Sequence, residues 1–155
     1  MTHLPQTVWR AMRQSLLWVW ASPNTLLGLL VGGIGLLSGG TAQRMGRTIE
    51  FQGGFVTWSL SRLGRGASAM TLGHVILGQT SWLLEATRRH ELVHVRQYEY
   101  WGPVFLPAYG LCALWLHLRG RNGYWDNPFE RQAYAEAACG EEPRTCDDPT
   151  REDRR

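Results

Sequence analysis

Cysteine pairs and charged side chains are both scarce in this sequence. The 155 residues include three cysteines and no CxxC pair, which excludes a zinc ribbon built on cysteines. Charged residues make up 19% of the chain, and the net charge of +3 is too small and too scattered to indicate nucleic-acid binding. No GxSxG motif or Cys-His pattern indicates a serine or cysteine nucleophile. The length is typical of a single domain with a hydrophobic core.

The longest stretch without charge lies near the N-terminus. No charged side chain occurs from Gln14 to Gln43, and the stretch exceeds the roughly 20 apolar residues that a membrane span requires. It is consistent with a span or re-entrant hairpin broken at Pro23, with a signal peptide, or with a buried core helix. We predict an apolar, membrane-associated segment over residues 1–43, with residues 15–38 contacting lipid. This predicts a protein of the bacterial inner membrane, in an orientation that the flanking arginines leave open.

The middle of the chain indicates β-structure. The run TIEFQGGFVTWSL (residues 48–60) alternates in part, and ASAMTLGHVILG (residues 67–78) is an apolar run bounded by glycine. We predict that these runs form two antiparallel strands joined around SRLGRG. With the helices described next, the predicted fold class is α+β, in which a small antiparallel sheet of two or three strands packs on helices.

Three helices are predicted after the strands. The first begins at a cap, Thr80 or Ser81, and stops at Gly102, which precedes a proline. The second, LPAYGLCALWLHLRG, is apolar on most faces and therefore lies deep in a core or against lipid. The third follows Asn127, a suitable N-cap, with proline at the first helical position. Residues 139–155 are polar and charged, and we predict a disordered tail there.

The first of these helices contains the sequence HELVH. His90 and His94 are four residues apart and share one helix face, so two neutral imidazoles at this spacing can ligate one Zn²⁺ at about 2.0–2.1 Å. Glu91 is turned by about 100°, which places its carboxylate beside the metal, where it can take a proton from a metal-bound water. The alternative is an ordinary helix on which Glu91 forms ion pairs with neighbouring arginines.

Catalytic zinc needs a third protein ligand and a fourth position open to water. Glu130 is the favoured third ligand, because it begins a separate helix that can pack across the first. Glu130 is also at the third position of its helix, where a carboxylate commonly caps the helix end. The alternative is therefore that Glu130 is a cap and not a ligand. The other candidates are three carboxylates and one histidine: Glu99, Asp126, Glu136 and His117.

HELVH, followed by a helix carrying NPFERQAY, resembles the gluzincin class of zinc metallopeptidases. The resemblance covers residues 67–138 and implies that His90, His94 and Glu130 bind zinc while Glu91 is the catalytic base. The same stretch also resembles a small uncharacterised bacterial family that shares segments similar to MTLGHVILG, HELVHVRQYE and NPFERQAY. The chain departs from thermolysin-like enzymes, in which an aspartate stands in place of Tyr134, so the partner that orients the histidines is left open.

The resemblance implies a small membrane-associated zinc hydrolase that cleaves a peptide or protein, with a helical metallopeptidase-like core inside a domain of residues 44–138. Tyr134 and His117 are candidate donors to the transition state, and Tyr98, Tyr109 and Tyr124 are further possibilities. The run MTLGHVIL is either an edge strand that binds extended peptide or an ordinary interior strand. The alternative function is a non-catalytic, zinc-stabilised membrane or scaffold module, in which a protein ligand fills the fourth position of the metal.

Overall fold

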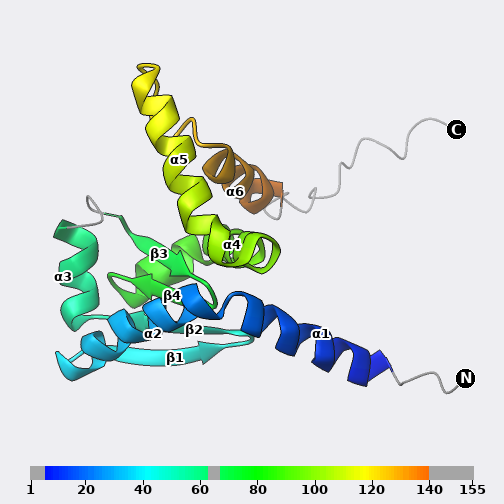
Figure 1. Ribbon diagram of the computed structural model, residues 1–155. Coiled ribbons are helices and arrows are strands. Elements are labelled where there is room, and N and C mark those ends of the chain that lie inside the picture. Colours follow the sequence, from blue (N-terminus) through cyan, green and yellow to red (C-terminus); the bar gives the residue numbers. More distant parts are fainter. Residues whose placement is uncertain (1–5, 63–66, 140–155) are drawn as a thin grey trace, which may run out of the picture.

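A computed structural model describes residues 6–62 and 67–139 of the chain (Figure 1). The fold is α+β, as predicted, with one four-stranded sheet between two groups of helices. The predicted polar tail lies outside the described residues, apart from its first residue. The elements in chain order are α1 (Gln6–Trp20), α2 (Ser22–Leu37), β1 (Thr41–Met45), β2 (Thr48–Gln52), α3 (Gly54–Arg62), β3 (Ala69–Leu72), β4 (Val75–Gly78), α4 (Ser81–Trp101), the 3₁₀ turn η1 (Gly102–Val104), α5 (Phe105–Leu118) and α6 (Pro128–Cys139).

The sheet is mixed and has the strand order β1-β2-β4-β3. Two antiparallel hairpins, β1/β2 and β3/β4, are joined by parallel pairing of β2 with β4, in which Ile49 lies opposite Val75. The predicted antiparallel pairing of the two runs is therefore wrong. Parallel neighbours need a crossover connection, and α3 followed by β3 makes it here.

The two predicted strand runs also divide differently from the prediction. In the first run only Thr48–Gln52 is a strand, because Gly53 and Gly54 adopt positive φ angles of 82° and 52° and the following residues form α3. The second run folds back on itself at Gly73, whose φ is +63°, and contributes both β3 and β4. The strand β1 was not predicted.

Side chains of alternate residues separate the two faces of the sheet. Phe51, Val75 and Leu77 form one buried cluster with residues of α3, and half-buried residues of α2 pack against it. Ile76, which points the other way, is buried with Leu84 and Val95 of α4. The sheet is therefore covered by α2 and α3 on one face and by α4 on the other.

Helix α2 approaches the sheet closely because it presents glycines to it. A Cβ added to Gly28 would lie 2.7 Å from Cβ of Val75, and one added to Gly32 would lie 2.5 Å from the ring of Phe51. The apolar N-terminal segment is thus interrupted between α1 and α2, at Ala21, and its second helix is part of the packed domain.

The predicted helix signals after the sheet are confirmed. Thr80 caps α4, and its hydroxyl oxygen accepts a hydrogen bond from the Leu83 amide at 3.2 Å. The helix ends at Gly102, where φ is +57° and the ring of Trp20 covers the position a side chain would occupy. Asn127 caps α6 by accepting from the Phe129 amide at 3.2 Å.

Among the described residues, one continuous helical segment is long and apolar enough to cross a membrane by length and composition: Ser81–Leu118, with a mean hydropathy of 1.2 over its most apolar window. A core helix can meet the same criteria, but only 17% of this window is buried. Six charged side chains lie in the α4 part, whereas the α5 part has none. Helix α2 is apolar but shorter, at 16 residues.

Candidate metal centre

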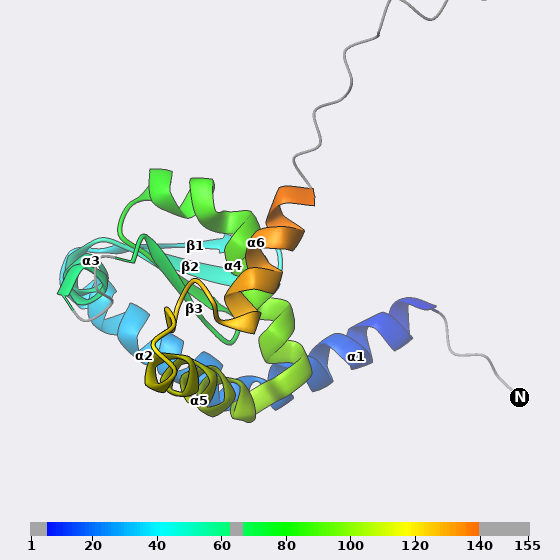
Figure 2. The ribbon, with the colours of Figure 1, turned by 90° about the horizontal axis from the view of Figure 1, so that it is seen from above.

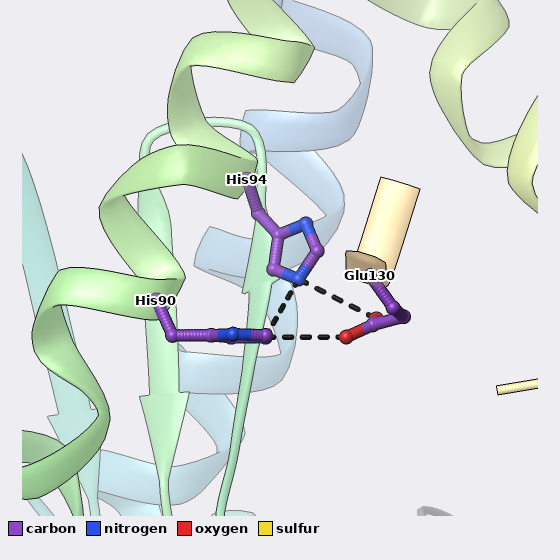
Figure 3. Close-up of side chains that lie close together, drawn as sticks. All are labelled: His90, His94 and Glu130. Carbon is purple, nitrogen blue, oxygen red and sulfur yellow. Dashed lines mark hydrogen bonds and ion pairs between the residues drawn. The ribbon is translucent and has the colours of Figure 1, made fainter. Parts of the chain in front are cut away.

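Helices α4 and α6 bring three of the predicted site residues together (Figure 3). His90 Nε2 lies 3.0 Å from His94 Nε2 and 3.2 Å from Glu130 Oε2. The other carboxylate oxygen of Glu130 lies 3.4 Å from His94 Nε2. One ligand atom from each residue falls within 4.8 Å of the others, so the group can hold a metal ion.

The packing of α6 on α4 places Glu130 at this position. Asn127, which is fully buried, anchors the start of α6 and donates to the Tyr109 carbonyl at 3.3 Å. Phe129 packs with Tyr98 and Phe105 in a second core cluster. The first turn of α6 is held against α4 in this way, and its carboxylate faces the two imidazoles.

The capping alternative for Glu130 does not describe its contacts. The Asn127 amide donates to the Tyr124 carbonyl at 3.0 Å instead of to the carboxylate. The carboxylate faces the histidines and accepts from the Tyr109 hydroxyl at 2.9 Å. Glu130 is 4% exposed, so its charge is compensated inside the protein.

The donor set fits a cation. Two imidazole nitrogens 3.0 Å apart require a proton or a positive ion between them, because two lone pairs at that distance repel. Glu130 Oε2 and His90 Nδ1 are buried and lack a hydrogen-bond partner among the described residues. Two imidazoles with one carboxylate are a common protein ligand set for zinc.

The electrostatics of the cluster also favour a cation. Burial raises the pKa of Glu130, but the two imidazoles beside its carboxylate outweigh burial and bring the pKa to about 2. Burial lowers the pKa of His94, yet the Glu130 and Glu91 carboxylates raise it above its ordinary value. The site therefore stabilises positive charge, which a proton or a metal can supply.

Glu91 lies beside the ligand group and is not one of its three members. Its side chain is buried and accepts a hydrogen bond of 2.7 Å from the Thr71 hydroxyl on β3. Burial raises the pKa of Glu91 although the nearby His94 and the Thr71 hydrogen bond lower it. Strand β3 thus fixes the carboxylate that the sequence predicted as catalytic base.

Gln97 orients His94 and was missed in the sequence. Its Oε1 lies 2.8 Å from His94 Nδ1, so the imidazole donates that hydrogen and leaves Nε2 free for a metal. The amide nitrogen of Gln97 donates to the Phe129 carbonyl and to Gln132, both at 3.0 Å. Its position three residues after His94 on the same helix face is the signal that identifies it.

Tyrosines from three parts of the chain surround the group. Tyr109 of α5 holds Glu130, as described above. The ring of Tyr134, a predicted transition-state donor, lies 4.5 Å from the ring of His90 between centroids, and Tyr134 is 43% exposed. Its hydroxyl is 3.1 Å from that of Tyr124. Tyr134 therefore stands between the ligands and solvent.

The remaining predicted candidates lie elsewhere. His117 is exposed in the last turn of α5, and the ligand group found among the described residues does not include it. The carboxylates considered as third ligands bind arginines instead: Glu99 with Arg47, Asp126 with Arg121, and Glu136 with Arg96. Strand β3 is an edge strand whereas β4 is interior, so the run MTLGHVIL contains one strand of each predicted kind.

His74, at the turn between β3 and β4, is fully buried away from the ligand group. Its ring stacks on Trp18 with 4.3 Å between centroids, and its Nε2 lies 3.3 Å from a carboxylate oxygen of Glu99.

Comparison with family models, curated proteins and solved structures finds no match to this chain.

Proposed function

We propose that this protein is a zinc-dependent hydrolase, a small metallopeptidase that binds zinc through His90, His94 and Glu130. The observation that carries the proposal is the convergence of these three ligand atoms within 4.8 Å, with the buried Glu91 carboxylate on the adjoining side of the same helix. Bound zinc would lower the pKa of a water toward about 7 and polarise a substrate carbonyl.

The side chains around the group supply the other chemical steps. Glu91 accepts the proton of the attacking water and passes it to the leaving amine, and its raised pKa suits a group that must both take and release a proton. Tyr134, exposed beside His90, donates a hydrogen bond to the oxygen on which charge develops. Tyr109 and Gln97 keep Glu130 and His94 in place.

The same arrangement favours an enzyme over a zinc-stabilised scaffold module. A closed structural zinc site uses four protein ligands, whereas an open one keeps a position for water. The group formed by the described residues has three members, and Tyr134 beside it is half exposed.

Metal content tests the site directly. Elemental mass spectrometry of the detergent-purified full chain should find about one zinc per protein, as expected for one set of three ligands. His94→Ala and Glu130→Ala should each lose the zinc. Glu136→Ala is the matched control, because Glu136 lies on α6 with Glu130 but pairs with Arg96. This variant should keep the metal. Wild-type protein without zinc, under conditions that spare bound metal, would refute the site.

Hydrolysis tests the role of Glu91 separately from zinc. Glu91→Gln should keep zinc and lose at least about 100-fold in cleavage, the usual contribution of a general base. Cleavage is measured by mass spectrometry on a mixture of peptides, with the exposed Glu85→Gln on the same helix as control. If the zinc-loaded wild type and Glu91→Gln behave alike, the metal site stands and the catalytic assignment fails.

A further inference from the structure

Three helices lie along one side of the molecule. Figure 2 shows α1, α2 and α5 along the lower edge of the molecule, with the sheet and α4 above them in the picture. In Figure 1 the same helices lie at the front, where α1 and α2 run across the molecule and α5 extends away from them. Two of these helices, α2 and α5, carry no charged residue.

The outward stripe of α2 is apolar. Leu26, Leu30 and Leu37 lie opposite the glycines that face the sheet, since these positions are about half a helical turn away from Gly28 and Gly32. The three leucines are 64%, 62% and 91% exposed. A helix of an ordinary water-soluble domain presents polar residues on this stripe.

Helix α5 repeats the pattern. Its inner side is formed by Phe105, Tyr109 and Leu116, and its outer side carries exposed leucines at 111, 114 and 118. At the end of this helix the Arg119 guanidinium lies over the ring of Trp115, 4.1 Å from its centre. Tryptophan and arginine at the margin of an apolar surface are typical of the boundary between lipid and water.

The two stripes are held in one rigid arrangement. The Asn24 side chain on α2 donates to the Gly102 carbonyl at the start of η1, at 3.0 Å, and is buried. Trp20 of α1 packs on the same Gly102. The turn η1, which precedes α5, therefore packs against the junction of α1 and α2.

We propose that the outward stripes of α2 and α5, together with Leu16 and Val19 of α1, form one apolar layer that lies in the plane of a lipid bilayer. The inference is independent of the hydrolase proposal. Many large apolar side chains exposed on one side of a molecule are typical of a contact site for a membrane or a protein. A bilayer fits it better than a second protein copy, because protein interfaces carry about one hydrogen bond per 100–200 Å² and these stripes offer leucines.

In-plane docking also follows from the dimensions of the helices. At about 1.5 Å per residue, α2 is about 24 Å long and α5 about 21 Å, both short of the roughly 30 Å hydrocarbon core. Helix α4, which extends α5 to the length of a span, carries six charged side chains that a hydrocarbon core would not accommodate. Helix α2 also has the sheet packed along one side. The layer therefore enters one leaflet, and the sheet and metal centre stay on the same side of the membrane.

Vesicle binding tests the layer. The full chain is diluted from detergent onto preformed vesicles of phosphatidylcholine and phosphatidylglycerol, and flotation measures the bound fraction. Leu30→Glu with Leu114→Glu should weaken partitioning by about 100-fold, because burial of each leucine contributes about tenfold. Trp82→Glu is the control, since Trp82 is 72% exposed at the start of α4, and it should bind like the wild type.

Two further measurements decide the alternatives. Circular dichroism should show the same fold for both variants, since every substituted side chain is already exposed. Protease added outside the vesicles should reach both chain ends if the layer lies in one leaflet, whereas a single span would protect one end. The proposal is overturned if the folded double variant floats like the wild type, if one end is protected, or if sedimentation shows that the leucines instead join two copies of the chain.

Discussion

Gln97 gives the clearest prediction at the scale of one residue. Its carbonyl oxygen fixes the tautomer and the ring orientation of His94, and its amide is held by the backbone of α6. Gln97→Ala should weaken zinc binding by about 10–100-fold, the usual loss when a hydrogen-bond partner of a metal-bound histidine is removed. Competition with a fluorescent chelator measures the affinity.

The matched control is Gln43→Ala. Like Gln97, Gln43 makes a side-chain hydrogen bond, which it donates to the Glu50 carboxylate, but it lies on the exposed strand β1. Its replacement should leave the zinc affinity unchanged. Equal affinities for Gln97→Ala and the wild type would mean that helix packing alone orients the imidazole.

Part of this site was predictable from residue spacing alone. His90 and His94 share a face because they are four positions apart, and Glu91 is turned aside by the same geometry. The position of Glu130 depends on how α6 crosses α4, and the buried side chains of Asn127 and Phe129 determine that crossing. Spacing along one helix gives no information about such a crossing, so Glu130 was the favoured third ligand but other carboxylates stayed open before the fold was known.

At the scale of elements, helix boundaries were predictable and strand pairing was not. The cap at Thr80 and the stop at Gly102 act within a few residues, so they can be read locally. Strand β1 is exposed at all five positions and has no apolar alternation to reveal it. Strands β2 and β4 pair in parallel although α3 and β3 separate them in the chain. No local sequence pattern specifies such a distant partner.

The contact of α2 with the sheet yields a prediction for this element. Gly32→Ala should destabilise the protein by about 1–3 kcal/mol, because its Cβ would lie 2.5 Å from the buried Phe51 ring and the core must shift to admit it. Gly33→Ala, one residue later, should stabilise by about 0.5–1 kcal/mol, since nothing lies within 4 Å and alanine favours the helix.

Chemical unfolding of the two variants in the same detergent measures this difference. Opposite signs for adjacent glycines would show that α2 packs on the sheet as part of the domain. Equal, small effects would instead describe a helix that leaves the sheet and lies free in lipid, as a separate N-terminal membrane segment does.

At the scale of the whole molecule, a metal bound at the proposed site would link α6 to α4 in addition to the packing of Phe129. The sheet has its own core on both faces, built around Val75 and Ile76. The buried residues of α6 are Phe129, Glu130 and Ala133, and Glu130 is one of the proposed ligands. Zinc should therefore stabilise the attachment of α6 far more than it stabilises the sheet.

Hydrogen exchange with and without a chelator tests this link. Zinc at about 100 times its Kd stabilises the bound state by about 2.7 kcal/mol, so its removal should reduce protection of the α6 amides by about 100-fold. The β4 amides should change little, because the core around them does not include the ligands. In His94→Ala the chelator should have no effect on either element. Equal loss of protection in β4 and α6 would mean that the metal holds the whole fold together, and unchanged protection in α6 would mean that the aromatic contacts of Phe129 hold the helix without it.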